Sequence, residues 1–197
     1  MRSICAAAPT KSQMVELRRL ALDGLIEVRP RRFADDRGFF SETWNDAVWR
    51  EAGIAINFVQ DNHSLSKPRG TLRGLHFQSP PAAQAKLVRV TRGSAFDVAV
   101  DLRPGSPTFR QWAGVTLSSA AWNQLLIPEG FAHGFVTLEA DTEVQYKASA
   151  AYSPKHDRAI RFDDPALAID WPMPAADLVL SDRDRAAPLL ADVETGF

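Results

Sequence analysis

Short apolar segments recur along most of this chain, and residues that favour turns separate them. The clearest segments are residues 25–28, 55–59, 86–90, 95–101, 114–117, 124–127 and 134–138. Several alternate apolar and polar residues with a period of two, as half-buried strands do. Turn signals such as Arg92-Gly93-Ser94 and Pro128-Glu129-Gly130 lie between them. Because no long helical pattern intervenes, the sequence predicts an all-β fold, an antiparallel sandwich or barrel.

Three segments depart from the strand pattern. Residues 1–22 are assigned to an N-terminal extension of uncertain order, in which residues 11–22 could form a short basic helix, and residues 23–197 are assigned to one domain. A short helix is expected over residues 46–52, with Asn45 as its N-cap. The last part of the chain should wrap as irregular chain with short helical turns, because it contains Pro165, Pro172, Pro174 and Pro188.

Length and composition restrict the classes of protein to which the chain can belong. Its 197 residues suit one domain, and 45% hydrophobic with 24% charged residues is a globular balance. The formal net charge is −1, so neither nucleic acid nor a membrane is an expected partner. Cys5 is the one cysteine, which excludes an internal disulfide framework and a multi-cysteine metal site. No apolar run reaches the roughly 18 residues of a membrane helix, and none suits a signal peptide, so a cytoplasmic protein is expected.

The densest group of polar residues lies within residues 60–78. Its amide, guanidinium and imidazole groups are the composition of a pocket for a polar anionic ligand. A polar outer face of an edge strand is the alternative for any single residue in it. In a regular strand Arg73 and His76 would lie on opposite faces, unless a bulge at Gly70 or Gly74 re-aims them.

A second group of candidate residues surrounds the turn at residues 128–133. This segment resembles the Pro-x-Gly-x-x-His motif of the cupin superfamily, whose other motif carries His-x-His on a strand. Here the other motif reads His76-Phe77-Gln78, and two histidines with one amide are a poor set of metal ligands. We therefore expect a cupin barrel without a metal, in which histidine serves as a general base. A satisfied core histidine is the alternative for His133 alone.

Two further residues suit proton transfer next to a carbonyl group. Lys86 begins a predicted strand, and its ammonium suits stabilisation of an enolate. Tyr146 lies on a late strand, and a phenol with an ordinary pKa of about 10 can donate a proton to a carbanion. The ordinary alternatives are a surface charge for Lys86 and a strand aromatic for Tyr146.

Six motifs occur in the order that is typical of one enzyme family. They are residues 36–42 (DRGFFSE), 60–64 (QDNHS), 72–78 (LRGLHFQ), 86–88 (KLV), 128–135 (PEGFAHGF) and 163–172 (DDPALAIDWP). Together they resemble the dTDP-4-dehydrorhamnose 3,5-epimerase family over roughly residues 23–185. The resemblance implies an antiparallel double-stranded β-helix, or jelly-roll (cupin) barrel, with a few short peripheral helices. It also implies epimerisation of dTDP-4-dehydro-6-deoxy-D-glucose at C3 and C5 through enolate intermediates, without a redox cofactor or a metal.

The resemblance assigns roles to individual residues. It makes His76 the general base, Asp184 the carboxylate that orients it, and Tyr146 the proton donor, with Asp170 as a competing candidate for the carboxylate. The substrate-binding residues that it implies are Lys86 and His133 at the enolate oxygen or the sugar, Arg73 at the pyrophosphate, Tyr152 stacked on thymine, and Gln60, Asp61, Asn62, Asp157 and Arg183.

The resemblance also implies a homodimer, because Arg37 and Glu42 match residues that reach the nucleotide from a partner subunit. The chain departs from the family pattern where Ala150 and Ala151 replace an acid and an aromatic residue, where Asp157 replaces a glutamate, and where Arg183 replaces a lysine. Three alternatives stay open from the motifs: an epimerase acting at C3 alone, a metal-dependent cupin oxygenase, and a cupin that binds a sugar nucleotide without catalysis.

Overall fold

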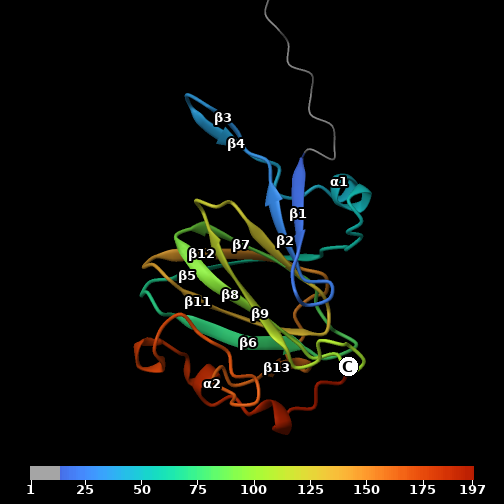
Figure 1. Ribbon diagram of the computed structural model, residues 1–197, viewed down its shortest axis with the longest axis vertical. Helices are drawn as coiled ribbons and strands as arrows, with labels where there is room; N and C mark the ends of the chain where they lie inside the picture. The colour runs from blue at the N-terminus through green and yellow to red at the C-terminus, as the bar shows by residue number, and fades with distance from the viewer. Residues whose placement is uncertain (1–13) are drawn as a thin grey trace, which may run out of the picture.

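A computed structural model describes residues 14–197, in which two antiparallel β-sheets pack face to face (Figure 1). The six-stranded sheet has the order β1 (Val15–Arg19), β2 (Ile26–Pro30), β10 (Gln124–Ile127), β7 (Lys86–Arg92), β12 (Thr142–Ala148) and β5 (Gln60–Ser66). The five-stranded sheet has the order β13 (Asp157–Ala159), β6 (Leu72–Gln78), β11 (Phe131–Thr137), β8 (Ser94–Asp101) and β9 (Trp112–Ser118). This architecture confirms the predicted all-β antiparallel barrel.

Short peripheral elements complete the fold. The hairpin of β3 (Phe33–Asp35) and β4 (Gly38–Phe40) projects away from the barrel (Figure 1). Helix α1 (Asp46–Glu51) begins as predicted, because the side chain of Asn45 accepts hydrogen bonds from the first free amides of the helix. The C-terminal chain contains only short helical turns, which are η2 (Ala175–Asp177), α2 (Asp182–Arg185) and η3 (Leu190–Asp192), also as predicted.

Two local predictions are wrong. The apolar segment 55–59 lies outside every strand; Ile56 and Phe58 instead pack against a buried cluster beneath helix α1. The basic segment 11–22 is not a helix over its described part, since strand β1 pairs with β2 there, and residues 11–13 lie outside the described residues. Strand β1 therefore attaches part of the predicted extension to the edge of the six-stranded sheet. No helix within residues 14–197 is long and apolar enough to cross a membrane.

The main apolar core lies between the sheets. Alternate residues of the strands point inward, so that Val88, Val90 and Val144 of one sheet meet Ala99, Leu117 and Phe135 of the other. A second cluster on the outer face of the five-stranded sheet is covered by C-terminal residues such as Leu167 and Leu190. Both sheets are thus held by apolar burial, and the polar residues on their inner faces gather where this core ends.

One buried carboxylate stabilises the end of strand β8. Asp101 is fully buried and accepts hydrogen bonds from the backbone and guanidinium of Arg103, at 3.0 and 2.9 Å, and from the hydroxyls of Ser106 and Thr108. Burial alone would raise the pKa of Asp101, but these hydrogen bonds lower it from 3.8 to about 2. Asp101 therefore orders the turn that follows β8.

We expect the substitution Asp101→Asn to lower the free energy of unfolding at pH 7 by about 2–3 kcal/mol, because it leaves charged donors without their carboxylate. The pKa of Asp101 is lower in the folded state, so its contribution is present above pH 3.8 and is lost as the pH falls toward 2. The stability difference between wild type and variant should shrink over this range in urea titrations. Asp163→Asn, which removes a surface ion pair with Arg161, is the control and should have almost no effect.

Candidate active site

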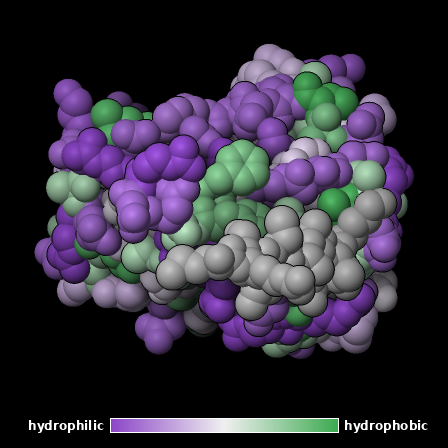
Figure 2. All heavy atoms as spheres, turned by 90° about the horizontal axis from the view of Figure 1, so that it is seen from above, coloured by the Kyte–Doolittle hydropathy of each residue, from purple (hydrophilic) through white to green (hydrophobic). Residues whose placement is uncertain are grey.

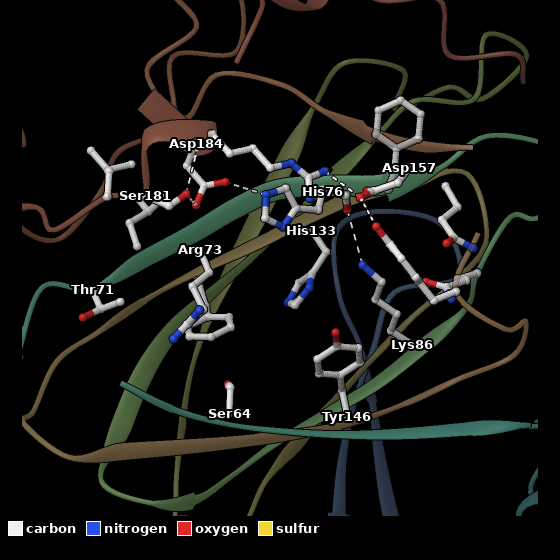
Figure 3. A pocket seen from close by; sticks show the side chains of 18 of the residues that line it. Ser64, Thr71, Arg73, His76, Lys86, His133, Tyr146, Asp157, Ser181 and Asp184 are labelled. Atoms are coloured by element: carbon white, nitrogen blue, oxygen red, sulfur yellow. Dashed lines mark hydrogen bonds and ion pairs between the residues drawn. The ribbon is translucent and has the colours of Figure 1, made fainter. Parts of the chain in front are cut away.

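A cavity of about 540 Å³ lies between the sheets beyond the end of the apolar core (Figure 3). Most of the predicted site residues line it: Arg73, His76, Lys86, His133, Tyr146, Tyr152, Asp157, Arg183 and Asp184. They come from five strands, from the segment after β12 and from helix α2. The fold therefore gathers into one place residues that lie more than 100 positions apart, as His76 and Asp184 do.

The two walls of the cavity carry different chemical groups. His76 of β6 and His133 of β11 stand opposite each other in the ladder of the five-stranded sheet. Lys86 of β7 and Tyr146 of β12 belong to the six-stranded sheet. All four side chains point into the same space (Figure 3). A ligand in the cavity would thus lie between imidazole groups on one side and a phenol and an ammonium on the other.

A bulge in β6 brings Arg73 and His76 to the same cavity. His133 pairs with His76 but Phe135 pairs with Arg73, so β6 holds one residue more than β11 in this stretch. An extra residue changes the alternation of side chains beyond it. Gly74 lies in the bulge with φ of +133°, and a Cβ there would lie 2.5 Å from the Cα of Gly134. The bulge that the sequence allowed at Gly74 is present.

His76 forms a hydrogen-bonded dyad with Asp184. The distance from His76 Nε2 to Asp184 Oδ1 is 2.5 Å, and the other carboxylate oxygen accepts a hydrogen bond from the Ser181 hydroxyl at 2.8 Å. Burial would raise the pKa of Asp184, but the hydrogen bonds from His76 and Ser181 hold it below its usual value. The carboxylate is therefore ionised and fixes the imidazole. Asp170 lines a separate groove and does not take this role.

Lys86, which is buried, and Tyr146, which is partly buried, are neighbours on the opposite wall. The Lys86 ammonium lies 5.9 Å from the centre of the Tyr146 ring and donates a hydrogen bond of 3.3 Å to the backbone oxygen of His76. Burial lowers the pKa of Lys86 to about 8, although Asp97 and Asp157 act to raise it. Burial, with help from Asp157, raises the pKa of Tyr146. At neutral pH the site thus holds an ammonium beside a protonated phenol.

Asp97 is a site residue that the sequence interpretation missed. It lies on the inner face of β8, is 1% exposed, and places both carboxylate oxygens 3.0 Å from Nε2 of His133. The available signal was a carboxylate in the otherwise apolar segment Ala95-Phe96-Asp97-Val98-Ala99, because a strand that is buried on both faces rarely carries an unpaired charge. Two His–Asp pairs therefore lie at the cavity, and the imidazole of each pair lines it.

Asp157, Arg183 and Tyr152 form a hydrogen-bonded group at the solvent-exposed edge of the cavity. Asp157 Oδ2 pairs with Arg183 Nη2 at 2.8 Å and accepts a hydrogen bond from the Tyr152 hydroxyl at 3.0 Å. Asp157 and Arg183, which replace a glutamate and a lysine of the family pattern, thus form an ion pair with each other. Arg73 is also exposed, and its guanidinium is oriented by Ser66 and by the backbone oxygen of Leu65.

Three glutamines hold the segment that carries Tyr152. Gln60 accepts from the Tyr152 amide at 2.8 Å, and Gln84 donates to the backbone oxygen of Ala150 at 2.7 Å. Gln78 donates to the oxygen of Ala151 and accepts from the amide of Ser153. These bonds position the chain without contribution from the side chains of Ala150 and Ala151.

Five predicted site residues are not among those that line the cavity. Gln60 and Asn62 point inward on β5 and bond to each other, so they lie beside it. Asp61 points to the opposite face of the sheet, where it pairs with Lys147 at 2.9 Å. Arg37 is on the β3–β4 hairpin with its side chain 90% exposed, and Glu42 accepts a hydrogen bond from Asn45. The cavity therefore does not include Arg37 or Glu42 of the same chain.

The donor groups of the cavity are not arranged for a metal ion. Within residues 14–197, no group of three or more His, Cys, Asp or Glu side chains is placed to hold one. Gln78, at the position of the second cupin histidine, uses both ends of its amide on backbone groups. The arrangement suits instead the removal of a proton from a carbon next to a carbonyl group, with a base, an acid and a cation all in place.

Comparison with known proteins agrees with this chemistry. The family model for dTDP-4-dehydrorhamnose 3,5-epimerase matches residues 19–192. A dTDP-4-dehydrorhamnose 3,5-epimerase from Pseudomonas aeruginosa is 52% identical over 177 residues, which cover 89% of this chain and 96% of that one. A crystal structure of the enzyme from Bacillus anthracis with TDP and PPi bound superposes with a TM-score of 0.86 at 48% identity, covering 89% of this chain and 99% of that one. A crystal structure of dTDP-6-deoxy-D-glucose-3,5-epimerase from Legionella pneumophila in complex with dTDP-4-keto-L-rhamnose has a TM-score of 0.87 at 45% identity, covering 91% of this chain and 95% of that one.

We expect Gly74→Ala to destabilise the protein more than Gly38→Ala. Both glycines have nearly the same φ, +133° and +132°, so the backbone penalty is matched. A Cβ on Gly74 would collide with the backbone of Gly134, whereas nothing lies within 4 Å of a Cβ on Gly38. The additional loss should be about 1–3 kcal/mol in urea unfolding, as for other overpacked sites. Equal losses in the two variants would show that the close approach of β6 and β11 is not needed.

Proposed function

The chain belongs to the dTDP-4-dehydrorhamnose 3,5-epimerase family, and on this basis we propose that it converts dTDP-4-dehydro-6-deoxy-D-glucose to dTDP-4-dehydro-L-rhamnose by epimerisation at C3 and C5. The observation that carries the proposal is the placement of the His76–Asp184 dyad and of Tyr146 on opposite walls of one cavity. Inversion at a carbon needs a base on one face of the ring and an acid on the other, which this placement supplies.

The proposed reaction begins at the carbon next to the C4 ketone. The carboxylate of Asp184 accepts a hydrogen bond from the Nε2–H group of His76, which leaves the lone pair on Nδ1 as the base. The base takes the proton from C3, and the electron pair of the C–H bond moves to the C4 oxygen to form an enolate. The enolate then collapses and takes a proton from the Tyr146 hydroxyl on the other face. His76 then releases its proton to water and Tyr146 takes one up, which restores both side chains. The same steps at C5 complete the reaction.

Charge stabilisation comes from the walls of the cavity. The ammonium of Lys86 is buried, so its attraction for the enolate oxygen is not screened by bulk water. The guanidinium forks of Arg73 and Arg183 suit the oxygens of the diphosphate. The side chain of Tyr152 is more than half exposed, so its ring is accessible for stacking on the thymine ring of the nucleotide.

Epimerisation at C3 alone is the second candidate, because it needs the same base, acid and cation. The high identity to enzymes named as 3,5-epimerases supports the double reaction. The cytoplasmic location and the independence from a metal or cofactor stay predictions.

We expect the protein to exchange solvent deuterium into both C3 and C5 when it is incubated with the 4-keto sugar nucleotide in D₂O and followed by NMR. His76→Ala should lower the rate of exchange at least about 10²-fold, because the base is lost. Tyr146→Phe should keep proton abstraction but slow product formation. Incorporation at C3 alone would favour the mono-epimerase, and no incorporation by the folded wild type would overturn the proposed function.

The β3–β4 hairpin supports the proposal that the enzyme works as a homodimer. Phe39 and Phe40 are 51% and 70% exposed on this hairpin, which carries Arg37 away from its own cavity. Viewed from the hairpin end, the molecule shows apolar residues gathered near the centre of a largely hydrophilic face (Figure 2). We propose that this face packs on a second copy of the chain and that Arg37 and Glu42 reach the partner's cavity.

Heterodimers test this arrangement directly. A heterodimer of one Arg37→Ala subunit and one His76→Ala subunit should have about half of the wild-type activity, because one cavity receives an intact hairpin from its partner. The matched control is a heterodimer of His76→Ala with Tyr146→Phe, in which neither cavity is intact and activity should stay low. If Arg37 acted within its own subunit, the first heterodimer would be as inactive as the control.

A further inference from the structure

Asp97 is a buried acid that the proposed reaction does not use. It lies at the middle of β8, and within the described residues its recorded hydrogen-bond partner is the imidazole of His133. Asp101, on the same face of the same strand, differs because five hydrogen bonds from Arg103, Ser106 and Thr108 stabilise its charge and order a turn. Burial of a charge with so few donors costs stability, so folding alone gives no reason for Asp97.

We propose that Asp97 is a positioning residue of the active site, which holds His133 in the tautomer that accepts a hydrogen bond from the substrate and keeps Lys86 in its ammonium form. The effect of Asp97 on catalysis rests on the proposed function, whereas its effects on the tautomer of His133 and on the charge of Lys86 do not. The geometry behind it, a carboxylate 3.0 Å from an imidazole that lines the cavity beside Lys86, is independent of the substrate.

The first consequence concerns the proton on His133. Burial lowers the pKa of His133, although Asp97 acts in the opposite direction, so the imidazole is neutral at neutral pH. A neutral imidazole has one N–H, and the contact with Asp97 assigns it to Nε2. Nδ1 is then an acceptor only. His133 can therefore accept a hydrogen bond from a sugar hydroxyl, whereas the enolate oxygen must be stabilised by Lys86.

The second consequence concerns the charge on Lys86. Its pKa is about 8, and the negative charges of Asp97 and Asp157 keep it from falling further with burial. The other titratable groups around it are His76 on β6, Tyr146 on β12 and His133 on β11, with Arg73 across the cavity. Asp97 is 1% exposed and its negative charge raises the pKa of Lys86, so its removal should lower the pH at which Lys86 loses its proton.

Asp97→Asn tests the proposal, with Asp101→Asn as the matched control that removes a buried carboxylate from the same strand. In the wild type, kcat/KM should fall as the pH rises through about 8, when Lys86 becomes neutral. In Asp97→Asn this fall should begin about one pH unit lower or more, so that activity is lost mainly at high pH and recovers toward pH 6. Asp101→Asn should keep the wild-type shape of the profile. A wild-type profile in folded Asp97→Asn would overturn the proposal.

Two NMR measurements without substrate separate this inference from the proposed function. Titration of the Lys86 amine should show a lower pKa in Asp97→Asn than in wild type or Asp101→Asn. The ¹⁵N shifts of His133 in wild type should show a protonated Nε2 and an unprotonated Nδ1 at neutral pH, a result that does not require any variant to fold. A protonated Nδ1 would overturn the proposal, and failure of the wild type to act on the sugar nucleotide would overturn only the proposed function.

Discussion

Buried polar side chains between the two sheets need hydrogen-bond partners, and this need determines how the side chains around the cavity are arranged. Within residues 14–197, every buried side-chain nitrogen or oxygen has a hydrogen-bond partner. The two imidazoles meet carboxylates, and the glutamine amides meet backbone groups of the segment at residues 150–153. The groups that face the cavity are consequently fixed before a substrate arrives, which is what proton transfer at a carbon atom requires.

The two His–Asp pairs come from different parts of the structure. Asp97 belongs to a strand of the barrel itself, whereas Asp184 belongs to a helix of four residues in the chain that follows the last strand. The inner pair is shielded from solvent and the outer one is partly open. This difference suits the inner histidine for holding a substrate group and the outer histidine for exchanging protons with water.

The sequence predicted which segments form strands and which residues lie near the cavity better than it predicted the directions and partners of their side chains. Short apolar segments between turn signals located β7, β8, β9 and β10, and the Asn45 cap located α1, because both signals depend on neighbouring residues. The segment 55–59 has the composition of a strand, but it packs beneath α1, and only the tertiary structure decides between these outcomes. The motif around residue 60 suggested that Asp61 and Asn62 share a site, yet adjacent strand residues point to opposite faces. Asp97 was missed because its partner lies 36 residues away on another strand.

The position of Asp184 near the end of the chain has a consequence for biosynthesis. The last strand of either sheet ends at Ala159, so every strand of the barrel is translated before the carboxylate of the dyad. His76 thus gains its orienting carboxylate only after the residues that follow β13 have docked, and a chain that stopped at Ala159 would lack both Asp184 and the apolar residues that cover the outer face of the five-stranded sheet.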